Sequence, residues 1–179
     1  GKSNLYKALR LLAETGRGGV VNALAAEGGL ESTFWAGPEK ITRRMLAGDV
    51  EVEGGTRQLV KRLKLGFAGE DFGYAISLGL PPPTHSKFGL DPQVKHEAIW
   101  AGPVCRPASL LVQRSAAMVK LREGRQWQVV NQHMTEFDSL FDQVGSLHGS
   151  PEVLHLRASI RRWRFVDHLR SAPGALACQ

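Results

Sequence analysis

The sequence is poor in cysteine: its 179 residues include two, Cys105 and Cys178. They lie far apart, and neither belongs to a Cys-x-x-Cys or Cys/His spacing of the kind that binds zinc. The scarcity argues against a disulfide framework and against a structural zinc site. It makes a reducing, cytoplasmic compartment the expected location.

The sequence also lacks an uninterrupted apolar stretch of the roughly 20 residues that a membrane-spanning helix needs. It does not begin with methionine, and its first segment is an amphipathic helix pattern rather than a signal peptide. We therefore expect no membrane partner. We also expect that the N-terminus was cut by processing or that the sequence is partial.

The sequence has no large excess of basic over acidic residues. The 23 Lys and Arg residues stand against 17 Asp and Glu residues, which gives a net charge of +6. Such a balance suits a solvated surface, which we prefer, and it also suits contact with nucleic acid. The hydrophobic share of 42% is typical of a globular protein, and the length suits one domain with a real core.

Hydrophobic periodicity predicts helices at both ends of the chain and a mostly antiparallel sheet between them. Long helices do not alternate with the strands, so the pattern is not that of a doubly wound fold in itself. The expected helices cover 3–15, 20–27, 136–144 and 150–165; the expected strands form a hairpin over 57–80, a strand over 94–102 and a further pair over 109–131.

We expect a single, partial domain over residues 1–170, followed by a frayed tail over 171–179. Within it, residues 1–30 hold the first helical region and residues 57–131 form an antiparallel β lobe. Residues 136–170 supply helical segments and a strand.

The first residues, GKSNLYKALRLLAE, raise the question of a nucleotide site. Gly1, Lys2 and Ser3 match the last three positions of the phosphate-loop motif G-x-x-x-x-G-K-[ST]. In that motif the backbone N–H groups and the helix N-terminus hold phosphates, Lys contacts the β- and γ-phosphates, and Ser or Thr binds Mg²⁺. The first five positions and the preceding strand are not in this sequence. The triplet alone fits a simple N-terminal helix cap equally well.

Other segments along the chain carry a wider resemblance. They are STFWAGPE, FGYAISLGLP, FGLDPQVKHEAIW, LLVQRSAAMVKLREG and LRASIRRWRFVDHLR. Together with GKSN they resemble the RecF/SMC-like ATPases of bacteria, a branch of the ABC-type P-loop group often labelled AAA-family ATPases. The resemblance covers nearly the whole chain and places its start inside the Walker A motif. It implies an α/β fold of the P-loop NTPase, ABC/SMC-head type: a first helix, an antiparallel β lobe and C-terminal helices.

The resemblance also implies a function and its ligands. It implies that the intact protein binds ATP and Mg²⁺ and hydrolyses ATP between two heads of a homodimer, with DNA as a further partner. Carried over by position, Gly1 and Lys2 belong to the phosphate loop, Ser3 is the Mg²⁺ ligand and Asn4 continues the motif.

Such ATPases further carry a glutamine that senses the metal and the γ-phosphate. The resemblance implies Gln143, in SLFDQVG, for this role, with Gln132 as a weaker rival. The other interpretation, which we prefer, is a surface glutamine on a short helix.

Two motifs of the family are missing from these 179 residues. No run of four apolar residues is followed by Asp-Glu, so there is no Walker B motif and no catalytic base to name. The LSxG-type signature is also missing, because ISLGLP over 76–81 lies in a strand pattern and ends at prolines. In the family both elements lie nearer the C-terminus. We therefore expect this chain alone to be inactive.

Histidines do not indicate a metal site. His148 and His155 could share a helix face, but Pro151 lies between them and no carboxylate joins them at ligand spacing.

An arginine-rich stretch leaves a different class of function open. Its arginines surround Trp163 and Phe165, and they are Arg157, Arg161, Arg162, Arg164 and Arg170. Basic residues among aromatic ones can contact nucleic acid. We prefer an amphipathic helix that runs into a strand, with both aromatic rings in the core. The alternative function is a basic module that binds nucleic acid or protein without nucleotide chemistry.

Overall fold

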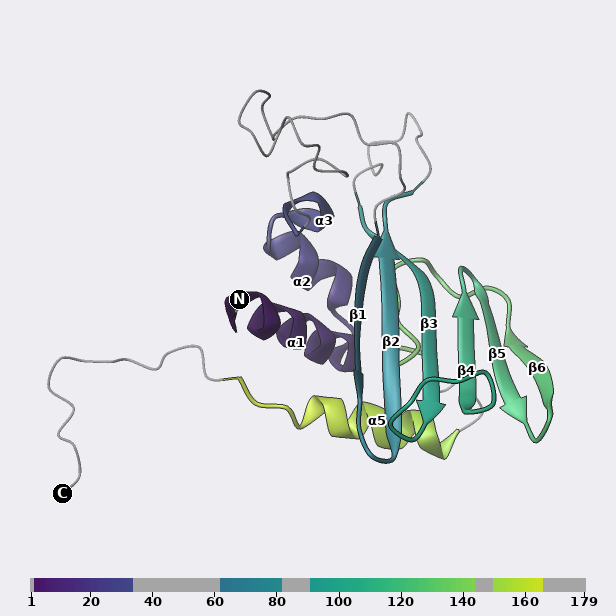
Figure 1. Cartoon of the computed structure of the whole chain (residues 1–179). Coiled ribbons are helices and arrows are strands. Elements are labelled where there is room, and N and C mark those ends of the chain that lie inside the picture. Colours follow the sequence, from purple (N-terminus) through teal and green to yellow (C-terminus); the bar gives the residue numbers. More distant parts are fainter. Residues whose placement is uncertain (1, 34–61, 82–90, 144–149, 166–179) are drawn as a thin grey trace, which may run out of the picture.

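The computed structural model describes residues 2–33, 62–81, 91–143 and 150–165. Figure 1 shows a mixed α/β arrangement with one sheet. The helices are α1 (Lys2–Arg17), α2 (Val20–Ala26), α3 (Gly29–Ser32) and α5 (Pro151–Arg161). The strands are β1 (Arg62–Ala68), β2 (Phe72–Gly79), β3 (Gln93–Ala101), β4 (Leu110–Ser115), β5 (Met118–Glu123) and β6 (Gln126–Asn131).

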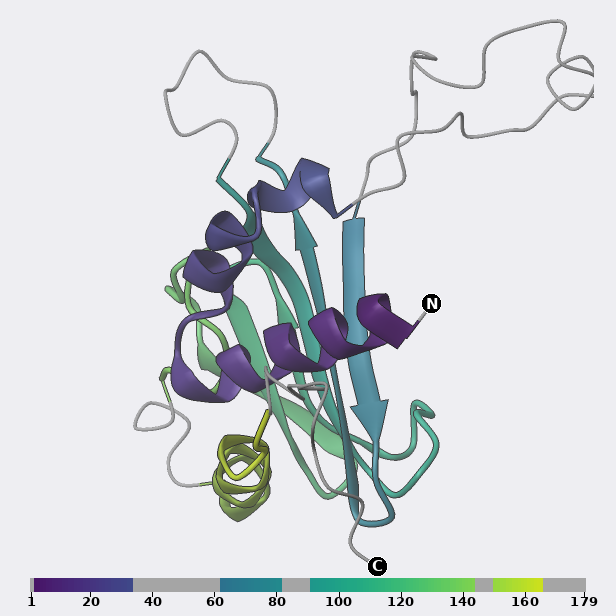
Figure 2. The same ribbon diagram turned by 90° about the vertical axis from the view of Figure 1, so that its left-hand side faces the viewer.

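The six strands form an antiparallel meander. Each strand pairs with its neighbour in the sequence, in the order β1-β2-β3-β4-β5-β6. The described helices lie on one face of this sheet (Figures 1 and 2), where α1 and α5 run across the strands. We call the opposite face the open face.

Alternation along the strands builds the core between the helices and the sheet. In β2, Tyr74, Ile76 and Leu78 point to the helices and are at most 2% exposed. Leu12 of α1 and Leu24 of α2 meet them from the helical side. Because side chains of a strand alternate between faces, the residues between these three point to the open face.

A close helix–helix contact joins the two ends of the chain. Gly16, near the end of α1, faces Ile160 of α5. A Cβ at Gly16 would lie 2.9 Å from the Ile160 Cγ2 atom. Ring contacts continue this junction, since Tyr6 packs edge-on against Phe165 and Phe67 of β1 packs edge-on against Trp163. Trp163 and Phe165 are thus partly buried packing residues.

The predicted hairpin is present, with β1 and β2 joined by Gly69, Glu70 and Asp71. The further pair predicted over 109–131 is present as β5 and β6, but the prediction missed that this segment also holds a third strand, β4. The turn between β4 and β5 consists of Ala116 and Ala117. Ala116 has a φ of 51°, a conformation that glycine or asparagine usually supplies. The sequence therefore carried no turn signal at this point.

The helix predicted over 136–144 was also wrong, since residues 136–143 form turns and bends. Buried side chains form hydrogen bonds with the backbone groups that a helix would pair with each other. The Arg114 guanidinium donates to the carbonyl oxygens of Thr135 and Asp138, and the Glu97 carboxylate accepts the Leu140 N–H. Side-chain bonds of this kind compete directly with helical ones.

The remaining boundaries follow the prediction in part. The first two helices and the strand over 94–102 correspond to α1, α2 and β3. Helix α5 ends at Arg161, and residues 163–165 are not in a strand. Residues 34–61 and 166–179, including the predicted tail and Trp35, lie outside the described residues.

Candidate functional site

Helix α1 spans Lys2–Arg17, so Lys2 and Ser3 of the Gly-Lys-Ser triplet belong to this 16-residue helix. Gly1 and the side chains of Lys2 and Ser3 lie outside the described part of the structure. Asn4 is exposed. The first N–H groups of any α-helix lack intrahelical partners, and they form the positive end of its dipole. A phosphate-loop motif is likewise followed by a helix, so the helical conformation of residues 2–17 is compatible with this motif.

The first turns of α1 project from the sheet. Leu5 is 64% exposed, and Lys7 is exposed beside it. Farther along the same helix, Leu11 and Leu12 are buried. The N-terminal half of α1 thus presents a large apolar side chain that the described residues do not cover.

Gln143 lies at the other end of this helix. Its amide nitrogen donates to Asp138 at 3.2 Å, and its amide oxygen accepts from Asn131 at 3.1 Å. The adjoining turn contacts the C-terminal end of α1, where the Ser139 hydroxyl donates to the Thr15 carbonyl at 3.1 Å. Eleven residues of helix separate Thr15 from Asn4, a length of about 16 Å at 1.5 Å per residue. The structure does not bring Gln143 to Asn4. Gln132 is exposed.

A buried ion pair fixes the turn that precedes Gln143. Arg114 of β4 and Glu97 of β3 lie 2.8 Å apart, and both side chains are 0% exposed. Arg114 also donates through Nε to the Ala116 carbonyl at 2.8 Å. Glu97 accepts the Tyr74 hydroxyl at 2.6 Å and the Leu140 N–H at 3.1 Å. Three strands and the turn are therefore held by one satisfied polar network.

Burial governs the protonation of this network. It raises the pKa of the Glu97 carboxyl, whereas Arg114, the Tyr74 hydroxyl and the Leu140 N–H lower it. Burial also raises the pKa of Tyr74 well above 10.0, and the Glu97 carboxylate adds to this shift. Because Tyr74, Glu97 and Arg114 are each at most 2% exposed, we regard the network as structural.

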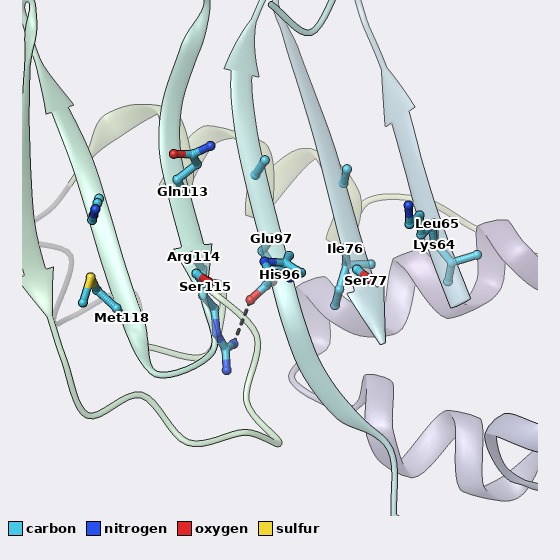
Figure 3. A pocket seen from close by; sticks show the side chains of 13 residues that line it. Lys64, Leu65, Ile76, Ser77, His96, Glu97, Gln113, Arg114, Ser115 and Met118 are labelled. Atoms are coloured by element: carbon cyan, nitrogen blue, oxygen red, sulfur yellow. Dashed lines mark hydrogen bonds and ion pairs between the residues drawn. The ribbon is translucent and has the colours of Figure 1, made fainter. Parts of the chain in front are cut away.

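A hollow of about 680 Å³ lies on the open face (Figure 3). In this view the helices lie behind the strands, so the hollow faces away from them. Small residues, Ala75, Ser77 and Ala98, form its floor, and Lys64 and Lys120 border it on β1 and β5. The volume is within the range of ligand-binding pockets, about 300–1,000 Å³.

One cross-strand row in the hollow is polar. The register places Lys64 opposite Ser77, and Ser77 opposite His96. Ser77 is 8% exposed, and its hydroxyl has no hydrogen-bond partner among the described residues. Partial burial lowers the pKa of His96 below 6.5, and the positive charges of Arg62 and Lys64 lower it further.

A second, arginine-lined hollow of about 740 Å³ lies where α1 and α5 end. Its lining residues are Arg17, Arg161, Arg162, Trp163, Arg164 and Phe165. Arg17 is paired with Glu14 at 2.6 Å. The two rings are used in packing against Phe67 and Tyr6. This hollow therefore offers positive charge without a free aromatic face.

Sequence reasoning missed the polar row on the open face. The alternation of Arg62, Leu63, Lys64 and Leu65 does signal that one face of β1 is polar. What the sequence does not supply is the register that places Ser77 between Lys64 and His96. A β-bulge at Ser77 and Leu78 shifts this register by one residue.

Comparisons with protein families, curated proteins and solved structures find no match to this chain. Within the described ranges, no group of three or more His, Cys, Asp or Glu side chains could hold a metal ion. No helix in these ranges is both long enough and apolar enough to cross a membrane.

Proposed function

We propose that this chain is part of the ATP-hydrolysing head of a RecF/SMC-like, ABC-type ATPase. The observation that carries the proposal is that Lys2 and Ser3 belong to a 16-residue helix, α1, which continues to Arg17. A phosphate loop ends in this way, with Lys and Ser at the first turn. In the proposed site Lys2 binds the β- and γ-phosphates and Ser3 binds Mg²⁺.

The order of elements supports the same proposal. The resemblance implies a first helix followed by an antiparallel lobe, and the described chain has α1 followed by a six-stranded antiparallel sheet. Leu5 supports it as well, because an apolar side chain that is 64% exposed near the start of α1 suits a helix that packs against further chain.

The residues named for this site would do different parts of the work. Bound Mg²⁺ would neutralise charge on the phosphates, and the Ser3 hydroxyl would be one of its ligands. The Lys2 ammonium would act as a point charge, and the helix N-terminus would add backbone N–H donors. Gln143 retains its proposed role only if the turn over 139–143 reaches the nucleotide in the assembled head.

The proposal is tested on the protein encoded by the complete reading frame. We expect the frame to continue upstream of Gly1 into a strand and a glycine-rich loop. In that protein, Lys2→Ala should abolish Mg-ATP hydrolysis, measured as phosphate release. Lys7→Ala is the matched control, because Lys7 is an exposed lysine of the same helix whose partner is Glu27 on the surface. A start codon directly before Gly1, or equal activity of both variants, would contradict the proposal.

The second candidate function is a basic binding module without nucleotide chemistry, with the triplet as a helix cap. The open face favours it, because a pocket-sized hollow there is bordered by lysines and contains an unpartnered hydroxyl. The two functions differ in the upstream reading frame and in the effect of Lys2→Ala on nucleotide binding.

A further inference from the structure

The open face has an excess of positive charge. Within the six described strands, the carboxylates are those of Glu97 and Glu123. Glu97 points to the helices, where it meets Tyr74 and Leu140. Glu123 accepts from Gln128, which pairs with the partly buried core residue Leu121, so it also points away from the open face.

The cations on that face are spread over three strands. The register and the contacts of the strands place there Arg62, Lys64, Lys95, Lys120 and Arg122, and they place His96, whose pKa is lowered, on the same face. Arg122 donates to the carbonyl oxygens of Pro107 and Ala108, which leaves its charge uncompensated. No carboxylate among the described residues lies within ion-pair distance of these side chains. A polyanion is the partner that such a surface attracts.

Two observations indicate a specific binding site on this positively charged face. The Ser77 hydroxyl is buried and unpartnered on the floor of the hollow, between Lys64 and His96. A buried hydroxyl without a partner is unfavourable, and a bound phosphate oxygen would supply the missing acceptor. Lys64 would donate to the same phosphate from one side, and an imidazole N–H of His96 would donate to it from the other.

The far end of the face offers a surface for stacking. Trp127 of β6 is 37% exposed, and the Arg122 guanidinium lies 6.0 Å from its ring centroid. Val129, two residues farther along β6 and opposite Lys120, is 44% exposed. Aromatic side chains next to cations are the elements that bind unpaired bases.

We propose that the open face of the sheet binds single-stranded nucleic acid, with one phosphate held by Lys64, Ser77 and His96. The strand then runs across the small floor residues to Lys120, and a base stacks on Trp127. The inference holds for either function proposed above, since it involves no residue of α1.

The dimensions of the sheet favour a single strand over a duplex. Six strands at a spacing of about 4.8 Å make a face about 24 Å wide, whereas the major groove of B-DNA is about 12 Å wide. The sheet therefore cannot enter the groove to contact bases. Unpaired bases, in contrast, lie flat on a sheet and stack on its aromatic side chains.

The experiment measures fluorescence anisotropy of a labelled oligothymidylate of about 12 nucleotides with the whole 179-residue chain. Wild-type chain should bind, and its affinity should fall between about 50 mM and 200 mM salt. The double variant Lys64→Ala/Lys120→Ala should weaken binding about tenfold or more. It should also reduce the salt slope by about 1.4, since each lost phosphate contact on a single strand removes about 0.7.

The matched control is Arg161→Ala/Arg162→Ala. It removes the same charge from exposed arginines of the second hollow. We expect it to bind like the wild type. An equal loss in this control would overturn the proposal, because binding would then follow net charge or the arginine-lined hollow. Tighter binding of a duplex of the same length, or no binding at low salt, would overturn it too.

Ser77→Ala separates a binding role from a structural one. Since the hydroxyl has no partner among the described residues, its removal should leave the thermal midpoint unchanged or raise it. Oligothymidylate affinity should nevertheless fall several-fold. Unchanged affinity in this variant would overturn the assignment of the phosphate to Ser77.

Discussion

The Arg114 guanidinium lies 2.8 Å from the Glu97 carboxylate, and both side chains are fully buried. Arg114 makes further bonds to the carbonyl oxygens of Ala116 and Thr135, so its donors are well used. Removing one member of a buried ion pair strongly lowers the stability of the fold, because the other charge then remains buried without a partner. The pair connects the β4–β5 turn to the segment that carries Gln143.

Arg114→Met is expected to lower the free energy of unfolding by about 3–5 kcal/mol, because it leaves the Glu97 carboxylate buried and unpaired. Urea unfolding followed by circular dichroism measures this loss. Arg125→Met, at an exposed position in the β5–β6 turn, is the control and should change stability by less than about 0.5 kcal/mol. A similar, small effect at both positions would show that the pair does not hold the turn.

Gly16→Val should destabilise the protein, because its Cβ would approach Ile160 Cγ2 to 2.9 Å at the α1–α5 contact. We expect a loss of about 1–3 kcal/mol, as for other overpacked sites. Thermal unfolding measures the loss. The control Asn22→Val introduces the same residue at an exposed position of α2. If both variants melt alike, helix propensity rather than packing explains the effect.

His96 should titrate below 6.5, because partial burial and the positive charges of Arg62 and Lys64 oppose its protonation. Lys95, its neighbour in β3, adds a further charge on the same face. Lys64→Ala should raise the pKa of His96 toward 6.5. A pH titration of the imidazole C–H resonances by NMR tests both statements. A pKa above 6.5 in the wild type would contradict them.

The same shift predicts a pH dependence of stability. Since the folded pKa of His96 lies below the unfolded value, the histidine contributes stability that is fully present above about pH 6.5. That contribution is lost as the pH falls through the folded pKa. Because His96 is exposed, the effect is small, and it should disappear in His96→Gln. Chemical denaturation at several pH values, with both proteins, measures it.

The 179-residue chain by itself should not hydrolyse Mg-ATP. The proposed mechanism needs a Walker B carboxylate and a signature motif, and neither is in this sequence. Calorimetric titration and a phosphate-release assay test this expectation. Micromolar affinity together with turnover would mean that other residues of the chain supply these functions.

Sequence patterns predicted the parts of the fold that local physics determines. The helix at α1 and the β1–β2 hairpin both follow from the spacing of leucines and aromatic residues. The β4–β5 turn was not predicted, because the residue with a positive φ in this turn is Ala116 and not a glycine. The conformation of the segment over 136–143 was predicted wrongly, because backbone groups in and beside it form hydrogen bonds with Arg114 and Glu97, which are distant in sequence.

The candidate sites differ in the same way: one is a contiguous motif, and the other is formed by residues that are distant in sequence. Residues 1–4 could be proposed from the sequence because a phosphate loop is a contiguous motif. The row of Lys64, Ser77 and His96 was missed because it exists only through the register of three strands. The half-buried position of Gln143 at the C-terminal end of α1 depends likewise on distant contacts.

The meander and the α1–α5 contact have opposite consequences for folding. Strands that pair with their sequence neighbours can form hairpin by hairpin, which favours rapid folding. Helix α1, in contrast, precedes the sheet in the sequence, and Gly16 can contact Ile160 only after the residues between them have been made. During translation the side of α1 around Gly16 therefore lacks its partner until α5 has been made. Among the described elements, the contact between α1 and α5 is thus one that forms late.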